Sequence, residues 1–106
     1  MRGKQSLAHT SLLVLSLLSR QDMYGYQMIS TLEQKLDRTF ALKEGTLYPI
    51  LRELESQGAV SCYGQEVSGR VRKYYHLTRK GKRLLAEERE QWERYARAIN
   101  TVLELS

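Results

Sequence analysis

The sequence contains a single cysteine, and this excludes several kinds of site. Cys62 stands alone among 106 residues, so neither an intrachain disulfide nor a zinc site with several cysteine ligands can form. We expect a half-buried thiol on a strand, because redox-sensing cysteines are exposed, have a low pKa and often lie near a second cysteine. A chain with so little cysteine suits a reducing compartment, and we expect a cytoplasmic protein.

Long apolar runs are also missing. The longest spans residues 12–18 and is interrupted by Ser16, far short of the roughly 20 residues that cross a bilayer. The basic start at residues 1–4 precedes this run as in a signal peptide, but no small-residue cleavage site follows. The sequence therefore predicts neither a membrane-spanning helix nor a signal peptide, and we expect no membrane among the partners.

Groups that carry out catalysis are scarce. His9 and His76 lie far apart in the chain, and no cluster of carboxylates or cysteines accompanies either of them, so we expect no metal site. There is no Ser-His-Asp order, no phosphate-binding glycine loop and no carboxylate pair. We therefore expect neither an enzyme nor a cofactor.

The chain has a surplus of positive charge, with 17 Lys and Arg against 12 Asp and Glu and a formal net charge of +5. Its length fits one domain and its composition is that of a globular protein. A basic domain favours a polyanionic partner such as nucleic acid, although an acidic membrane surface suits the same charge. Charge alone does not choose between the two partners.

Residues 43–58 (KEGTLYPILRELESQG) predict an amphipathic helix. Its apolar face has three- and four-residue spacing and consists of Leu47, Ile50, Leu51 and Leu54. The opposite face carries Lys43, Thr46, Tyr48, Pro49 and Arg52. Gly58 is expected to end the helix in the left-handed conformation. Because proline has no N–H group, Pro49 predicts a late start or an irregular opening turn.

Two helices are predicted before this one. Residues 5–19 are apolar over so wide an arc that we expect contact with the chain's own core and with a second subunit. Residues 23–36 follow, capped by Asp22. Gly25 in the opening turns indicates close approach of another backbone or of a phosphate. The linker 37–42 is expected to point Phe40 and Leu42 inward, and the helix that follows it completes a helix-turn-helix.

A β-hairpin is predicted next. Residues 59–63 and 71–77 are prone to form strands, and residues 64–70 between them are polar with two glycines. In the second strand, alternation places Val71 and Lys73 on the same face as Tyr75 and Leu77, and we expect this face to pack on the helices. The hairpin would project as a basic wing.

Thr78 is expected to cap a last helix over residues 79–105. Apolar residues on it recur every 3.5 residues, interrupted at Glu88, and form a seam of Leu85, Trp92, Tyr95, Ile99 and Val102. A helix of this length measures roughly 40 Å, too long to lie wholly on one small domain, so we expect it to pair with a twin. Residues 1–77 would form a winged helix-turn-helix and residues 78–106 a C-terminal dimerisation helix, within one structural unit.

Several of these segments together resemble the PadR family of bacterial transcriptional regulators over nearly the whole chain. The matching motifs are Tyr24-Gly25-Tyr26, the EGTLYPIL block at residues 44–51, Leu54-Glu55, Gly58, the RKYY block at residues 72–75, and Leu77-Thr78 with Gly81. The resemblance implies a mainly α winged helix-turn-helix with a small β-hairpin, a homodimer held by the C-terminal helix, and repression relieved by a small effector. Because one helix follows the wing, the chain is similar to the short subfamily.

The resemblance also implies an effector site. In some short members a tryptophan on the last helix stacks on flat aromatic drugs, and Trp92 stands at the matching place; the alternative is an ordinary tryptophan of the dimer core. Glu88, one turn earlier, would favour a cationic ligand or be a solvated edge of the seam. Lys43 stands where the family often has serine or threonine.

The expected partner is double-stranded DNA. Arg52 could reach guanine, and Thr46 a thymine methyl group or a phosphate. The remaining candidates suit phosphates or the minor groove, and they are Tyr24, Tyr26, Lys43, Tyr48, Arg70, Arg72 and Lys73. A dimer sets two recognition helices about 34 Å apart, which predicts a pseudo-palindromic operator.

Two other interpretations remain. A winged-helix module could bind a protein partner through its long helix without regulating a promoter; salt separates the two, because a phosphate-bound complex weakens steeply as salt rises. Binding to RNA ranks last, because no exposed aromatic platform for single strands is evident.

Overall fold

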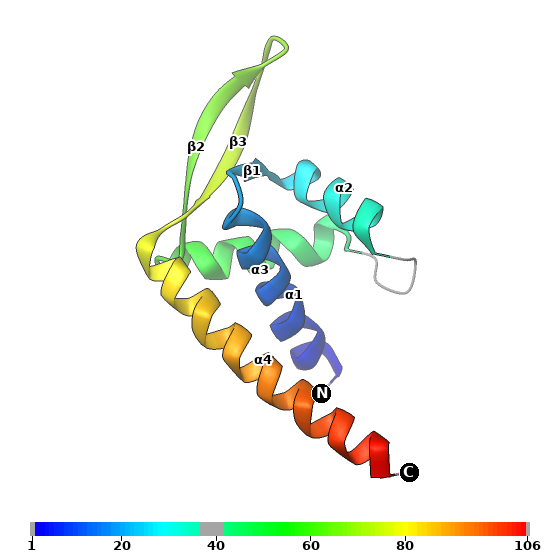
Figure 1. Cartoon of the computed structure of the whole chain (residues 1–106). Coiled ribbons are helices and arrows are strands. Elements are labelled where there is room, and N and C mark those ends of the chain that lie inside the picture. The colour runs from blue at the N-terminus through cyan, green and yellow to red at the C-terminus, as the bar shows by residue number, and fades with distance from the viewer. Residues whose placement is uncertain (1, 37–41, 106) are drawn as a thin grey trace.

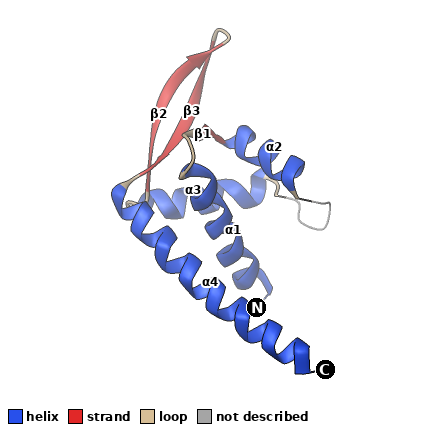
Figure 2. Ribbon diagram, in the orientation of Figure 1, coloured by secondary structure: helices blue, strands red, loops and turns tan. Residues whose placement is uncertain are grey.

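A bundle of helices carries a small sheet at one side. The computed structural model describes residues 2–36 and 42–105. In chain order the elements are α1 (Arg2–Leu18), β1 (Met23–Tyr24), α2 (Gly25–Lys35), α3 (Glu44–Ser56), β2 (Val60–Val67), β3 (Arg70–Leu77) and α4 (Arg79–Leu105). Figure 2 shows the β2–β3 hairpin projecting from the helices on one side and the end of α4 projecting on the other. The mainly helical fold with a small hairpin that the sequence predicts is confirmed.

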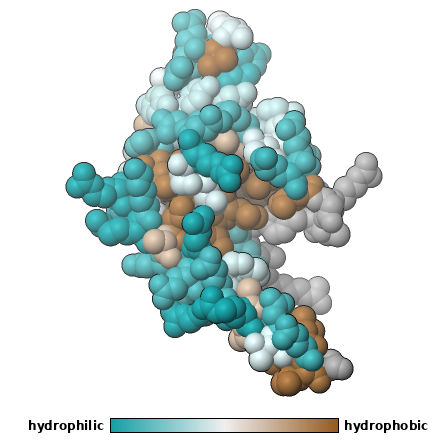
Figure 3. All heavy atoms as spheres, viewed as in Figure 1, coloured by the Kyte–Doolittle hydropathy of each residue, from teal (hydrophilic) through white to brown (hydrophobic). Residues whose placement is uncertain are grey.

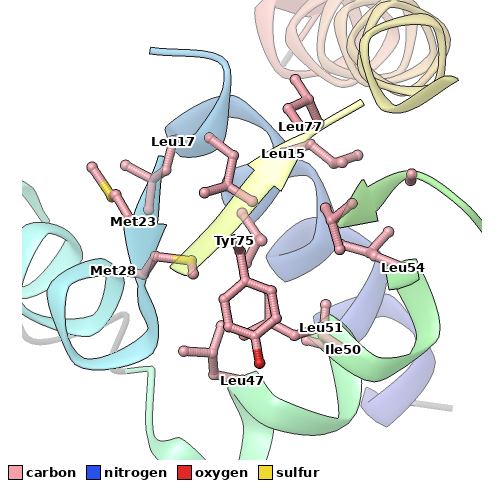
Figure 4. Packing of buried hydrophobic residues seen from close by; sticks show 14 of the residues in the cluster. Leu15, Leu17, Met23, Met28, Leu47, Ile50, Leu51, Leu54, Tyr75 and Leu77 are labelled. Atoms are coloured by element: carbon pink, nitrogen blue, oxygen red, sulfur yellow. The ribbon is translucent and has the colours of Figure 1, made fainter. Parts of the chain in front are cut away.

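The core lies where α1, α2, α3 and β3 meet, and Figure 4 shows its apolar side chains converging. The four apolar residues predicted for the inner face of α3 are all buried, with Leu47 and Leu51 at 0% exposure. Val14 and Leu15 of α1 are equally inaccessible, and Tyr75 of β3 reaches into the same cluster. This packing fixes α3 relative to the root of the hairpin.

The start of the second helix differs from the prediction. Met23 and Tyr24 form a short strand that pairs antiparallel with β3, opposite Tyr75 and Tyr74, and the sheet order is β1-β3-β2. The helix begins only at Gly25. Strand pairing prevails here because β3 offers a free edge, which periodicity within residues 23–36 does not reveal. The predicted cap is also wrong, because the Asp22 carboxylate contacts Tyr63 and His76 instead.

The hairpin is longer than predicted. Most of the expected loop 64–70 is strand, and the turn consists of Ser68 and Gly69, whose φ angles are 54° and 80°. Two consecutive positive φ angles are typical of the tight turns that match strand twist. Val71 is 77% exposed, contrary to the expected packing of its face. The reason is that the distal half of the hairpin extends past the helices (Figure 1).

Helix α3 begins at Glu44 in spite of Pro49 inside it, so of the two predicted alternatives the late start is wrong and the irregular opening turn is found. The opening turn is tightened by a bond from the Thr46 N–H group to the Lys43 carbonyl at 3.0 Å, beside the regular bond from Leu47. Gly58 ends the segment with φ +82°, as predicted. The prediction for Phe40 lies outside the described residues, while Leu42 is buried.

Helix α4 begins as predicted. The Thr78 hydroxyl accepts a hydrogen bond from the Gly81 N–H group at 3.0 Å. The glycine at position 81 is needed because a Cβ atom there would meet the Ala59 carbonyl oxygen. Further along, the helix projects from the rest of the molecule (Figure 1). With this projecting end included, the molecule measures 57 × 30 × 25 Å along its principal axes.

Candidate nucleic-acid interface

The outer face of α3 is a polar surface on a rigid support. Lys43, Thr46 and Arg52 are exposed, while the opposite side of the helix is anchored by fully buried leucines. Arg52 has no carboxylate partner within the described part of the chain. An arginine that is not paired within its own protein keeps its guanidinium donors available for a phosphate or a base edge.

Tyr48 is set apart from these residues because its ring is half-buried. It packs against the core and lies directly over Gly25, whose missing side chain leaves room for the ring. The sequence predicted that Gly25 allows the close approach of another backbone or of a phosphate. The structure places the side chain of Tyr48 from α3 there instead. Tyr48 joins α2 to α3 and presents only part of its ring to the surface.

The wing carries cations on both of its faces. Arg70 is exposed near the turn, and Arg72 lies over the Tyr24 ring with its guanidinium carbon 4.6 Å from the ring centroid. On the other face, Lys73 Nζ is 5.6 Å from the centroid of Tyr75. The neighbouring Tyr75 and Cys62 raise the pKa of Lys73, so this side chain stays charged. The wing is thus basic beyond the edge of the helices.

Of the two tyrosines that flank Gly25, Tyr26 is 60% exposed and Tyr24 is half-buried in the sheet. Tyr24 contacts Tyr74 edge to face, with ring centroids 5.4 Å apart. Tyr74 in turn stacks on Tyr63 at 5.7 Å and an interplanar angle of 18°. Tyr24 therefore belongs to an aromatic row at the root of the wing, and Tyr26 stands free on the surface.

Sequence reasoning missed the roles of Asp22, Tyr63 and His76. The Tyr63 hydroxyl donates to Asp22 Oδ2 at 2.7 Å, and His76 Nδ1 lies 2.9 Å from Asp22 Oδ1. Burial opposes ionisation of Asp22, but the hydrogen bonds from Tyr63 and His76 outweigh it and lower the pKa of this carboxyl group. Alternation in residues 71–77 does place Tyr74 and His76 on one face, but their partner in the α1–β1 turn depends on the tertiary fold.

Cys62 lies on the face of the wing that looks toward α3. Its thiol is half-buried, as predicted, and lies 3.2 Å from Glu55 Oε2. The hydrogen bond to Glu55 and burial raise the pKa of Cys62, against a smaller opposing effect of Lys73. A raised pKa keeps the thiol protonated and poorly nucleophilic, the opposite of what redox sensing requires.

The predicted seam of α4 divides into two parts. Leu85 is buried in the core of its own chain. Beyond it, large apolar side chains lie exposed along the helix, and they are Trp92, Tyr95, Ile99, Val102, Leu103 and Leu105. Figure 3 shows hydrophobic atoms gathered at the projecting end of α4. Exposed apolar surface of this extent on one helix marks an interaction site.

Trp92 borders a cavity of about 350 Å³ lined also by His9, Leu12, Leu13 and Leu36. The His9 ring meets Trp92 edge to face, with centroids 5.0 Å apart. Sequence reasoning gave His9 no role, because nothing in the sequence places residue 9 beside residue 92.

Glu88 does not line this cavity but lies one helical turn before Trp92. Its Oε1 atom is shielded from solvent and has no hydrogen-bond partner within residues 2–36 and 42–105. Burial, with a contribution from the neighbouring Glu87, raises the pKa of Glu88.

The described residues offer neither a metal site nor a membrane-spanning helix. No group of three or more histidines, cysteines or carboxylates there could hold a metal ion. No helix within the same ranges combines the length and apolar character needed to cross a bilayer.

Helices α2 and α3 followed by a basic hairpin constitute a winged helix-turn-helix, a fold that places its second helix in the major groove of DNA. Residues 14–87, more than half of the sequence, match the model of the Transcriptional regulator PadR-like family. The chain therefore belongs to the PadR-like family, whose transcriptional regulators are DNA-binding proteins.

Solved structures and curated relatives are similar to this chain over most of its length. The crystal structure of smu.1704 from Streptococcus mutans UA159 has a TM-score of 0.82 and 39% identity, covering 92% of this chain and 89% of that one. A PadR family transcriptional regulator from Eggerthella lenta DSM 2243 gives a TM-score of 0.81 and 32% identity, with 97% and 88% covered. The chain is also 33% identical over 82 residues to Transcriptional regulator YqjI of Escherichia coli, covering 77% of this chain but only 38% of that protein.

Proposed function

We propose that this chain is a sequence-specific DNA-binding transcriptional regulator that acts as a homodimer. The observation that carries the proposal is the exposed polar face of α3 beside a wing that carries Arg70, Arg72 and Lys73. In this proposal residues 1–77 form the DNA-binding part and residues 78–106 the dimerisation helix. A cytoplasmic location fits binding to bacterial DNA.

The proposed contacts divide into those that read bases and those that position the protein. Arg52 would donate to the O6 and N7 atoms of guanine in the major groove, and Thr46 would contact a thymine methyl group or a phosphate. The side chains proposed to contact phosphates or the minor groove are Tyr24, Tyr26, Lys43, Tyr48, Arg70, Arg72 and Lys73. Tyr48 is the weakest of these candidates, because its ring is half-buried against Gly25.

Homodimerisation through α4 is supported by apolar residues that the single chain leaves exposed. Trp92 is 41%, Tyr95 53% and Val102 63% accessible, and Ile99 lies between them. Leu85 is a weaker candidate for the dimer interface than the sequence predicted, because it is already buried in the core of its own chain. Pairing of two chains would set two recognition helices about 34 Å apart and require a pseudo-palindromic operator.

We also propose that the protein is a repressor released by a small planar effector at Trp92. The cavity bordered by Trp92 and His9 supports this, since it has the size of a small ligand site. Glu88 lies one turn before Trp92 and outside the lining of this cavity, so its buried, unpartnered Oε1 atom would favour a positively charged effector that extends past Trp92 along α4. A ligand stacked on Trp92 would have to displace the His9 ring or fit beside it, because the two ring centroids are 5.0 Å apart.

Selection of duplexes from a random pool tests DNA binding. The protein should enrich a pseudo-palindrome whose half-sites are one helical turn apart, and Arg52→Ala should relax the preference at one position in each half-site. Lys43→Ala, the matched control, should weaken all duplexes alike, because a phosphate contact carries no sequence information. Failure to enrich any sequence would leave the protein-interaction module as the better account.

The effector is tested through the fluorescence of Trp92, the only tryptophan of the chain. Titration with planar aromatic cations should quench it saturably, and the same compounds should release the selected duplex. In a Trp92→Leu variant that still dimerises, the duplex should no longer respond to the compounds. A response equal to that of the parent would remove Trp92 from the effector site.

A further inference from the structure

Three tyrosines form a continuous row across the root of the wing. Tyr24 of β1 is opposite Tyr74 of β3, and Tyr74 is opposite Tyr63 of β2. Their rings contact one another in that order, at centroid distances of 5.4 and 5.7 Å. The row thus joins all three strands on one face of the sheet. Aromatic pairs of this kind favour one arrangement of the strands over others.

Asp22 holds this row from the turn before β1. Its two carboxylate oxygens bind different strands: Oδ2 accepts the Tyr63 hydroxyl of β2, and Oδ1 lies 2.9 Å from His76 Nδ1 of β3. The hydrogen bond to Asp22 raises the pKa of Tyr63, so the phenol stays protonated and remains a donor. A single side chain therefore ties the turn after α1 to both strands of the wing.

The wing beyond this row is exposed and carries the cations. Arg72 extends from the strand position two residues before Tyr74, and its guanidinium group rests on the outer tyrosine of the row, Tyr24, at 4.6 Å. The Arg72 Nε atom is buried and has no hydrogen-bond partner in the described part of the chain. The ring of Tyr24 is therefore the contact that orients this guanidinium group.

We propose that Asp22 is a positioning residue for DNA binding, which holds Tyr63 and His76 so that the tyrosine row keeps Arg72 aimed at the DNA. Asp22 itself, as an anion, does not contact phosphate. The inference rests on the proposed DNA-binding function. The inference adds Asp22, which lies outside the recognition helix and the wing, to the residues on which DNA binding depends. Loss of Asp22 would act through Arg72.

A double-mutant cycle tests this relationship on one selected duplex, with binding measured by fluorescence anisotropy. The proteins are the parent, Asp22→Ala, Arg72→Ala and the double variant, assayed well below melting temperatures determined by circular dichroism. Asp22→Ala should weaken binding by about tenfold in the parent and by less than about twofold when Arg72 is already absent, as expected for coupled residues. It should also lower the slope of log affinity against log salt by about one, the effect of one lost phosphate contact.

Arg52→Ala provides the control, because Arg52 lies on α3 and shares no partner with Asp22. Its loss should combine additively with Asp22→Ala. Equal additivity with Arg72 and with Arg52, or no effect of Arg72→Ala alone, would overturn the inference, whereas failure of the parent to bind any selected duplex would instead overturn the proposed function. Tyr63→Phe, which removes one hydroxyl and keeps the ring, should weaken binding in the same direction; unchanged affinity of this variant would also contradict the role of Asp22.

Discussion

Tyr48 of the recognition helix occupies the space that Gly25 leaves free at the start of α2. A Cβ atom placed on Gly25 would collide with the Tyr48 hydroxyl and lie 2.8 Å from the adjacent ring carbon. The contact sets how closely the two helices of the helix-turn-helix approach each other. Gly25 and Tyr48 come from different motifs of the sequence, and the fold brings them together.

Replacement of Gly25 by alanine should destabilise the protein. The new methyl group has to displace an aromatic ring that is itself packed on the core, and overpacking of this kind costs about 1–3 kcal/mol in the free energy of unfolding. Gly45→Ala is the matched control: nothing lies within 4 Å of a Cβ atom there, and alanine in a helix should stabilise by roughly 0.5–1 kcal/mol. Chemical denaturation of both variants measures the difference. If the two substitutions changed the free energy of unfolding by the same amount, Tyr48 would move aside without cost, contrary to this account.

Cys62 should react slowly with alkylating reagents. Its hydrogen bond to Glu55 raises the pKa of the thiol, and Lys73 has a weaker effect in the other direction. Glu55→Gln should therefore lower the pKa and speed alkylation by iodoacetamide near pH 8, because the thiolate is the reactive form. Lys73→Met should raise the pKa of the thiol and make alkylation slower than in the parent. A rate in Glu55→Gln no higher than in the parent would show that Glu55 does not control this thiol.

Glu88 should make stability depend on pH. Burial raises the pKa of Glu88 in the folded protein above the ordinary value of 4.5. Protonation of Glu88 therefore favours the folded state, and this contribution to stability is fully present below pH 4.5 and is lost as pH rises through the folded pKa. Glu88→Gln should consequently have a higher melting temperature than the parent at pH 7, and the difference should shrink toward pH 4. Glu93→Gln, at an exposed position of the same helix that has no ion pair among the described residues, should show no such trend. A melting temperature at pH 7 below that of the parent would mean that ionised Glu88 has a stabilising partner.

Dimerisation should depend on the exposed apolar row of α4. Ile99→Asp would place a carboxylate within that row, and burying an unpaired charge is costly, so the variant should be monomeric by analytical ultracentrifugation. Arg97→Asp is the control, since residue 97 lies on the opposite side of the helix, and the parent's oligomeric state should persist. A dimer that survives Ile99→Asp would place the interface elsewhere.

The sequence predicted those parts of the fold that arise from local periodicity. The buried leucines of α3, the left-handed Gly58 and the Thr78 cap of α4 all rest on short-range spacing, and the structure agrees with each. The strand of Met23 and Tyr24 was missed because two residues carry no period, and only the free edge of β3 gives them a partner.

The candidate site was predicted less completely. Exposed cations such as Arg52 and Arg70 follow from which face of each element is apolar. Asp22 could not be found in this way, because its partners lie 41 and 54 residues away in sequence. Tyr48 was placed on the surface because its contact with Gly25 depends on how α2 meets α3, which sequence spacing does not define.

The salt dependence of binding to a selected duplex tests the central claim most directly. The parent and Arg70→Ala should be titrated by anisotropy between about 50 and 200 mM salt, a range over which several phosphate contacts cost about 10³-fold or more in affinity. We predict a steep linear fall of log affinity with log salt, with a slope reduced by about one when Arg70 is removed. An affinity that barely changes with salt, or a slope identical in the two proteins, would contradict a DNA surface formed by the recognition helix and the wing.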